Sequence, residues 1–165
     1  MLLTEFDANR QAIINPEALH EPLEGFPKIA VSCFSRLTFQ RMLEMFPHEL
    51  IYETSMANVA IPIYKLVIDD NELAIFNAPV GASACVGILE DIFALGADKL
   101  VLFGTCGVLD EDIKETSIII PSHALRDEGT SFHYVEASDE IAVNVGVLDH
   151  FRSYVWIWSV LLLQL

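Results

Sequence analysis

The most chemically suggestive part of the sequence is the turn GTCG at residues 104–107, which directly follows the apolar run KLVLF. A glycine-rich turn at the end of a buried strand exposes backbone N–H groups, and these can bind an anion or a polar ring. Thr105 adds a hydroxyl group. No lysine follows, so the turn is not a P-loop, and its glycine spacing is not that of a dinucleotide site. A tight turn that merely leaves a strand explains the same residues equally well.

A second stretch with chemical potential is RDEGTSFHY, residues 126–134. It combines a cation, two carboxylates, a glycine, two hydroxyls, an imidazole and two aromatic rings. Such a loop can stack a flat base on an aromatic face while hydrogen-bonding the edge of the base. The alternative is an exposed polar loop with Phe132 packed into the core, and composition alone favours a binding function only slightly.

The apolar pattern around these stretches predicts an α/β domain. Apolar residues at helical spacing predict a helix over 37–46, and Ser83 is expected to cap a second helix that ends near Gly96. A final helix is expected from 137 to about 151, with Ser138 as its cap. Short apolar runs predict strands at 28–34, 48–54, 59–68, 73–80, 99–103 and 117–121. The strands at 59–68 and 73–80 are expected to form a hairpin.

Charge and composition limit the classes of function. The chain has 165 residues, 53% of them hydrophobic, which suits one domain with a sizeable core. Its formal net charge of -15 argues against nucleic acid or an anionic membrane as a partner. An anionic substrate would have to be bound by a local cluster of donors, because the field of the whole chain repels it.

Cysteine usage and the two ends of the chain indicate the compartment. The three cysteines are widely spaced, so neither a disulfide framework nor a metal site is expected. The first ten residues include acids and lack a secretory pattern, which favours the cytoplasm. The apolar stretch 154–165 is shorter than the ~20 residues that a membrane span needs.

Two long segments together resemble the purine nucleoside and uridine phosphorylase family. They are PVGASACVGILEDIFALGADKLVLFGTCGVLDEDI and IIIPSHALRDEGTSFHYVEASDE, and the resemblance covers roughly residues 28–150. It implies a three-layer α/β sandwich around a mixed, largely parallel sheet. It also implies an enzyme of nucleoside metabolism and purine salvage, a pentosyltransferase that assembles as a homo-oligomer, either a dimer or a trimer of dimers. The implied reaction is phosphorolysis of a purine or pyrimidine nucleoside to the free base and a pentose 1-phosphate, with inorganic phosphate as co-substrate and no cofactor.

The resemblance also implies roles for particular residues. Gly104 and Thr105 match a turn that binds phosphate and ribose, and Cys106 and Gly107 match the stretch beside the base. Tyr134 stands where the family has an aromatic residue against the base or sugar. In the loop after the first strand, Ser35 and Arg36 match phosphate-binding positions, although a helix-surface arginine is more often simply solvated. The family likeness requires the GTCG turn and the Tyr134 stretch to form two walls of one cleft. No catalytic acid or base is assigned.

Departures from the family pattern leave alternatives open. Leu102 stands where many phosphorylases have an arginine, and residues 32–35 replace a glycine-rich loop. A hydrolytic nucleosidase, which needs no phosphate-binding arginines, is therefore the alternative activity. The resemblance further predicts a C-terminally truncated member. Its parts would be an N-terminal arm (1–27), the N-terminal part of the α/β domain (28–150) and an atypical apolar tail (151–165). A non-catalytic product that retains fold and weak binding, or a plain oligomerisation module, is compatible with such a truncation.

Overall fold

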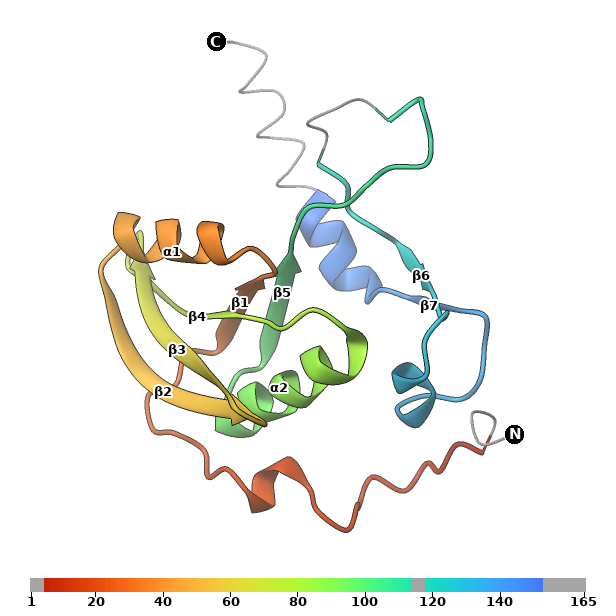
Figure 1. Cartoon of the computed structure of the whole chain (residues 1–165), viewed down its shortest axis with the longest axis horizontal. Helices are drawn as coiled ribbons and strands as arrows, with labels where there is room; N and C mark the ends of the chain where they lie inside the picture. The colour runs from red at the N-terminus through yellow and green to blue at the C-terminus, as the bar shows by residue number, and fades with distance from the viewer. Residues whose placement is uncertain (1–4, 114–117, 153–165) are drawn as a thin grey trace. The chain divides into compact units, whose positions relative to one another are not determined.

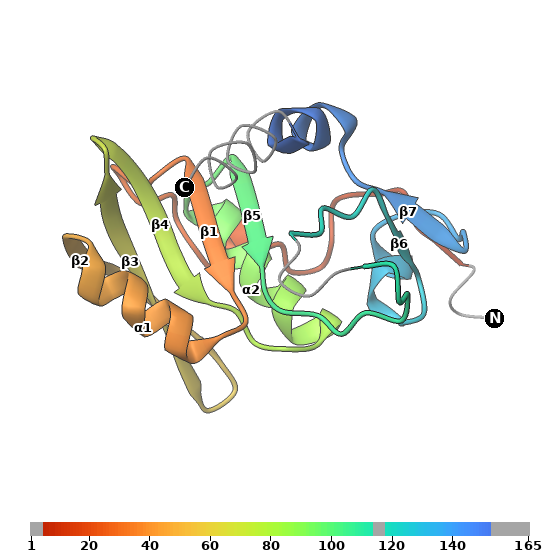
Figure 2. The same cartoon turned by 90° about the horizontal axis from the view of Figure 1, so that it is seen from above.

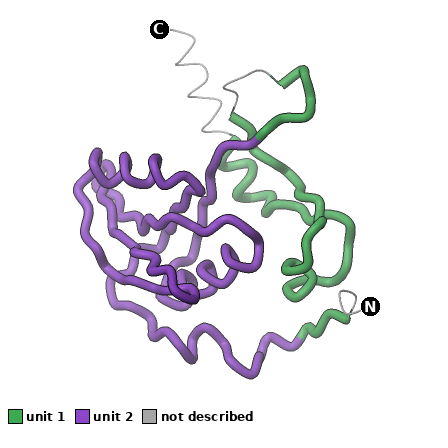
Figure 3. Tube along the Cα trace, in the orientation of Figure 1, with its two compact units in different colours: residues 1–8, 107–165 green, residues 9–106 purple. Residues whose placement is uncertain are grey.

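The structure is a computed structural model that describes residues 5–113 and 118–152. The chain forms two compact units, shown in different colours in Figure 3. Unit 2 is Asn9–Cys106, and unit 1 combines Met1–Ala8 with Gly107–Leu165. The predicted tail at 151–165 lies outside the described residues except for its first two positions.

Unit 2 is built on a mixed five-stranded sheet with the strand order β2-β3-β4-β1-β5 (Figure 1). Its inner strand β1 pairs in parallel with both β4 and β5, whereas β3 pairs antiparallel with both β2 and β4. The strands are β1 (Ile29–Cys33), β2 (His48–Met56), β3 (Val59–Ile68), β4 (Asn71–Asn77) and β5 (Lys99–Phe103). Two helices complete the unit, namely α1 (Arg36–Met45) and α2 (Ala82–Leu95).

The β3–β4 hairpin forms where the sequence predicts it. Ile68 pairs with Asn71, so Asp69 and Asp70 are the two central residues of the turn. Both have positive φ, at 47° and 63°. Two successive left-handed residues give the turn geometry that matches the twist of paired strands, and aspartate tolerates that conformation better than most residues do.

Helices cover both faces of this sheet, which makes the unit a three-layer sandwich (Figure 2). Side chains alternate between the faces along each strand, so Ala74 and Phe76 of β4 join the core under α2 while Ile75 joins the core under α1. The α2 core also contains Ile88 and Ile92, which are at most 1% exposed. This architecture confirms the fold class predicted from the sequence.

Polar contacts within unit 2 connect His20, which lies in the N-terminal arm, to β2 and α2. The imidazole of His20 contacts the Tyr52 hydroxyl through Nδ1 at 3.1 Å and the Asp91 carboxylate through Nε2 at 2.9 Å. Thr54 Oγ1 donates to the other oxygen of Asp91 at 2.6 Å. The contacts connect the arm, β2 and α2 on the face of the sheet that α2 covers.

Unit 1 contains less regular structure. A two-stranded antiparallel ribbon pairs β6 (His123–Leu125) with β7 (Glu140–Ala142), and the short helix η3 (Thr130–His133) lies in the loop between them. Residues 145–152 are helical, and the Asn144 side chain accepts a hydrogen bond from Val147 N at the start of that helix.

Three local predictions were wrong. Residues 118–121 are not a strand. The last helix begins at 145 instead of 137, because Ser138 and its neighbours form the approach to β7. The cap of α2 is Gly81, with a φ of 110°, and Ser83 lies within the helix. At Ser138 a tertiary hydrogen bond overrides the local signal, and at Gly81 a backbone conformation does so. Within the described residues, each helix is too short or too polar to cross a membrane.

Candidate functional site

The carboxyl ends of β1 and β5 bring two distant parts of the sequence together. The strands run parallel in register, with Cys33 opposite Phe103, and Phe34 N donates to Phe103 O at 3.4 Å. A Cβ atom added to Gly104 would lie 3.2 Å from Phe34 Cδ2, so the ring packs closely over the glycine. Ligands of α/β sheets collect at this kind of edge.

Ser35 caps helix α1 at this edge. Its Oγ accepts a hydrogen bond from Thr38 N at 3.2 Å and another from Thr38 Oγ1 at 3.0 Å. A hydroxyl oxygen that accepts two hydrogen bonds still has its own proton to donate. Arg36 is the first residue of the helix and is exposed. The pair therefore offers one hydroxyl donor and one guanidinium at the start of a helix.

Helix α2 starts at the same edge, because it follows the carboxyl end of β4, which is parallel to β1. Ser32 and Asn77 fix the approach to it. Ser32 Oγ donates to Phe76 O and accepts from Ala78 N, both at 2.9 Å, and Asn77 Nδ2 donates to Cys33 O at 2.6 Å. Sequence reasoning missed both positioning residues, since no local pattern marks a buried strand serine as a bridge.

Local electrostatics at this edge favour an anion. The first turns of α1 and α2 contain no acidic residue, although the chain has 24 of them. Each helix N-terminus carries a partial positive charge, because its first N–H groups have no acceptor within the helix. Gly104, Thr105 and Cys106 are exposed, and so is Arg36. This edge therefore supplies the local cluster of donors that an anionic ligand needs on so acidic a chain.

The structure brings four predicted phosphate-binding residues to this one edge, namely Ser35, Arg36, Gly104 and Thr105. Cys106 follows Thr105 in the sequence. Leu102, which replaces a family arginine, lies in β5 at the side of the sheet and is 40% exposed. The predicted base-binding residues Gly107 and Tyr134 belong to unit 1. Because the two stretches lie in different units, the expectation that they form one cleft stays a prediction.

In unit 1, Tyr134 ends the short helix η3. Its backbone N–H donates to Ser131 O at 3.1 Å, and its side chain is 49% exposed. The Glu128 carboxylate caps the start of the same turn, accepting from Thr130 N at 2.7 Å and from Ser131 N at 3.1 Å. Hydrogen bonds, chiefly from the Ser131 side chain, outweigh desolvation and lower the pKa of Glu128. The loop is thus held in a defined shape before any ligand is present.

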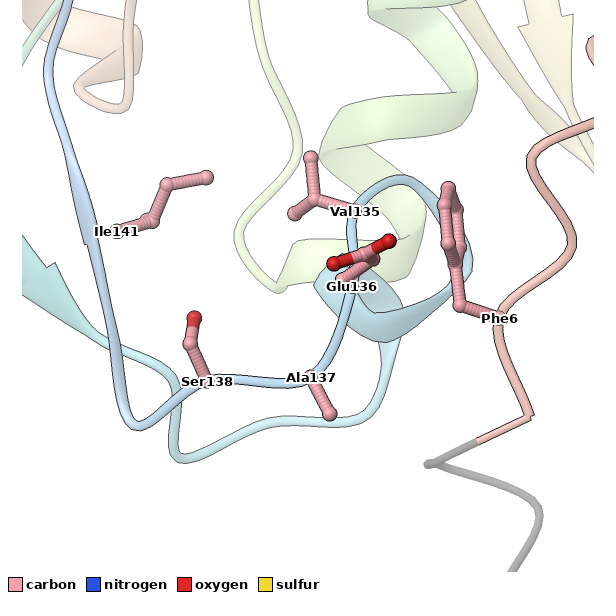
Figure 4. A pocket seen from close by; sticks show the side chains of 6 residues that line it. All are labelled: Phe6, Val135, Glu136, Ala137, Ser138 and Ile141. Atoms are coloured by element: carbon pink, nitrogen blue, oxygen red, sulfur yellow. The ribbon is translucent and has the colours of Figure 1, made fainter.

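Two hollows border this loop. One, of about 470 Å³, is lined by Phe6, Val135, Glu136, Ala137, Ser138 and Ile141 (Figure 4). The other, of about 540 Å³, is lined by Leu125, Arg126, Asp127, Phe132, Ala137, Ser138 and Asp139. Neither is lined by Tyr134, so we do not assign the nucleoside to either hollow.

Comparison with known proteins gives consistent matches. A family model described as the phosphorylase superfamily matches residues 28–155. A guanosine phosphorylase of Halorubrum lacusprofundi is 28% identical over 74 residues, which cover 43% of this chain and 31% of that protein.

Solved structures with the same fold include two nucleoside phosphorylases. Uridine phosphorylase from Vibrio fischeri has a TM-score of 0.70 at 18% identity, over 88% of this chain and 59% of that one. Purine nucleoside phosphorylase from Toxoplasma gondii, solved with immucillin-H, has a TM-score of 0.64 at 15% identity. The match covers 74% of this chain and 49% of that one. The chain spans less than two thirds of the length of each of these three proteins.

Proposed function

This chain belongs to the phosphorylase superfamily, and we propose that it acts in the phosphorolysis of a nucleoside to a free base and a pentose 1-phosphate. One observation carries the proposal. The parallel pairing of β1 with β5 sets Ser35 and Arg36 beside Gly104 and Thr105, at an edge where two helices begin. The three relatives are named a guanosine phosphorylase, a uridine phosphorylase and a purine nucleoside phosphorylase, and these names support the same reaction class.

Phosphate is the ligand we assign to this edge. The Thr105 hydroxyl, the exposed backbone of the GTCG turn and the Ser35 hydroxyl are hydrogen-bond donors, and Arg36 supplies a full positive charge. Such a set can bind a dianion at several oxygens at once. Inorganic phosphate is then a co-substrate, and the proposal requires no cofactor.

The chemistry asks the enzyme to stabilise opposite charges. A glycosidic bond breaks through an oxocarbenium-like state, with positive charge on the sugar and negative charge on the leaving base. A bound phosphate dianion both stabilises the sugar cation and attacks it from the face opposite the base. We propose that Tyr134 contacts the base or sugar of the nucleoside, with Cys106 and Gly107 as further base contacts. We assign no general acid.

The test is release of free base from inosine, guanosine and uridine by the purified chain, with and without inorganic phosphate. We expect release to require phosphate and to yield one pentose 1-phosphate per base. Equal rates in both conditions would establish hydrolysis instead. Binding of nucleoside without turnover would identify a non-catalytic member, and it is read as a rise in melting temperature at millimolar ligand.

We propose that the protein acts in the cytoplasm, in purine salvage, as a homo-oligomer of the dimer or trimer-of-dimers kind. Support comes from the family likeness and from the spaced cysteines. Sedimentation equilibrium of the purified chain measures the assembly, and a monomer at micromolar concentration would contradict this part of the proposal.

A further inference from the structure

One guanidinium lies at the centre of the loop that joins β6 to β7. Arg126 directly follows β6 and is only 7% exposed. Its backbone N–H donates to Asp139 O at 2.9 Å, which continues the pairing of the two strands. Arginine is seldom this buried, so the position calls for a specific set of acceptors.

Among the residues that the structure describes, the acceptors of this guanidinium are all uncharged. They are Ser131 Oγ at 2.9 Å from Nε, Glu136 O at 2.6 Å and Ser138 Oγ at 2.9 Å from Nη1, and Val135 O at 3.3 Å from Nη2. Three nitrogens of a planar fork thus fix the positions of four residues. A carboxylate partner would neutralise the charge more simply. The observed set instead shapes the backbone.

A ring contact adds to these hydrogen bonds. Arg126 Cζ lies 4.1 Å from the centroid of the Phe132 ring, within the range of a cation–π interaction. Phe132 belongs to η3, so the arginine contacts the helix at two successive residues, Ser131 and Phe132.

Tyr134 lies between these two sets of anchors. Ser131 and Phe132 precede it, and Val135 and Glu136 follow it, so both flanks of the tyrosine are held by the same side chain. The Glu128 carboxylate caps the turn, and Ser131 joins that carboxylate to the arginine. The tyrosine itself is half exposed.

We propose that Arg126 is a positioning residue for nucleoside binding, which holds the Tyr134 ring in place through Ser131, Phe132, Val135 and Glu136. The proposal rests on the proposed function, in which Tyr134 contacts the nucleoside. A side chain that is ordered before binding does not lose its freedom on binding. We therefore expect loss of the arginine to weaken nucleoside binding about three- to tenfold, the range set by ordering one side chain.

The kinetic test compares Arg126→Met and Arg126→Lys with the exposed Arg152→Met of the same unit as a matched control. With inosine and with uridine, we expect both Arg126 variants to raise the KM for nucleoside and leave the KM for phosphate within about twofold. Lysine keeps the charge but not the planar fork, so it should not rescue the KM. An equal rise in both KM values, or full rescue by lysine, would overturn the proposal.

A double-mutant cycle tests whether the arginine acts through the tyrosine. In a Tyr134→Ala background, adding Arg126→Met should change the KM for nucleoside by less than about twofold, because the ring that the arginine positions is gone. Additive effects of the two substitutions would show that Arg126 acts by another route and would refute the assignment.

A spectroscopic test separates this inference from the proposed function. The chain contains four tyrosines, and the ¹⁹F resonance of Tyr134 in 3-fluorotyrosine-labelled protein is assigned by its loss in Tyr134→Phe. Without ligand, Arg126→Met should shift or narrow that resonance towards the value of a mobile ring, and Arg152→Met should not.

If the resonance shifts but the chain shows no turnover, phosphorolysis is refuted and the role of Arg126 is not. An unshifted resonance would refute the role of Arg126. If Arg126→Met does not fold, Ser131→Ala and Ser138→Ala each remove one acceptor and are read by the same resonance.

Discussion

Substitution Ser32→Ala tests whether one buried hydroxyl fixes the approach to helix α2. Ser32 is fully buried, and its Oγ connects Phe76 O to Ala78 N with two hydrogen bonds of 2.9 Å. Each bond contributes about 1 kcal/mol, and a buried N–H left unpaired costs about 1–3 kcal/mol. We therefore expect a loss of about 2–4 kcal/mol in the free energy of unfolding, which corresponds to a fall in Tm of roughly 4–16 °C.

Urea unfolding followed by far-UV circular dichroism measures this loss, and amide hydrogen exchange locates it. The Ala78 N–H should exchange faster in the variant, since its acceptor is gone. Ser55→Ala is the matched control, because Ser55 is exposed on β2 and its loss should change stability by less than about 0.5 kcal/mol. If Ser32→Ala lowers stability by no more than the control does, the bridge contributes nothing and the reasoning from buried hydrogen bonds is wrong here.

Three further predictions concern the candidate site, the loop and the arm. Thr105→Val removes a hydroxyl at nearly constant volume. It should raise the KM for phosphate about tenfold or more, because it removes one hydrogen bond to a charged group, and the KM for nucleoside is the internal control. Glu128→Gln should abolish an acid titration of the Thr130 and Ser131 amide shifts in NMR. The pKa of Glu128 is lowered in the folded protein, so the stabilisation from its capping hydrogen bonds is fully present above the ordinary value of 4.5 and is lost as the pH falls through the folded pKa. A titration midpoint of these amide shifts above 4.5 would contradict this prediction. His20→Ala leaves Asp91 with only its Thr54 contact among those described and should destabilise unit 2 by about 1–3 kcal/mol; exposed His48→Ala is the control.

Much of unit 2 could be predicted from the sequence, because local periodicity reports which face of a segment is buried. The run 59–68 alternates apolar side chains, and the structure divides them between the two cores, with Ile61 and Ile63 on one face and Leu66 on the other. The hairpin at Asp69 and Asp70 follows from two residues that accept a left-handed backbone. Gly96 ends α2 with a φ of 128°, as its position predicts.

Local signals failed where a distant partner decided the outcome. Ser138 has the residue type of a helix cap, yet its Oγ accepts from Arg126 and donates to Glu140 O, and no helix starts there. By its sequence context, Arg126 is only a cation in a polar loop. Nothing in its neighbourhood distinguishes a buried arginine from a solvated one, because burial depends on acceptors 5–12 residues away that the chain must first bring together.

The residues of the candidate phosphate site can be identified without a structure, since the glycine-rich turn at 104–107 and the family likeness both point to them. The proximity of Ser35 to Gly104, in contrast, follows from the way the strands pair. That proximity exists because β1 lies between β4 and β5, and the chain reaches β5 from β4 through the crossover helix α2. Periodicity specifies a strand but not its neighbours, which are selected by burial of both sheet faces and by the constant hand of the crossover.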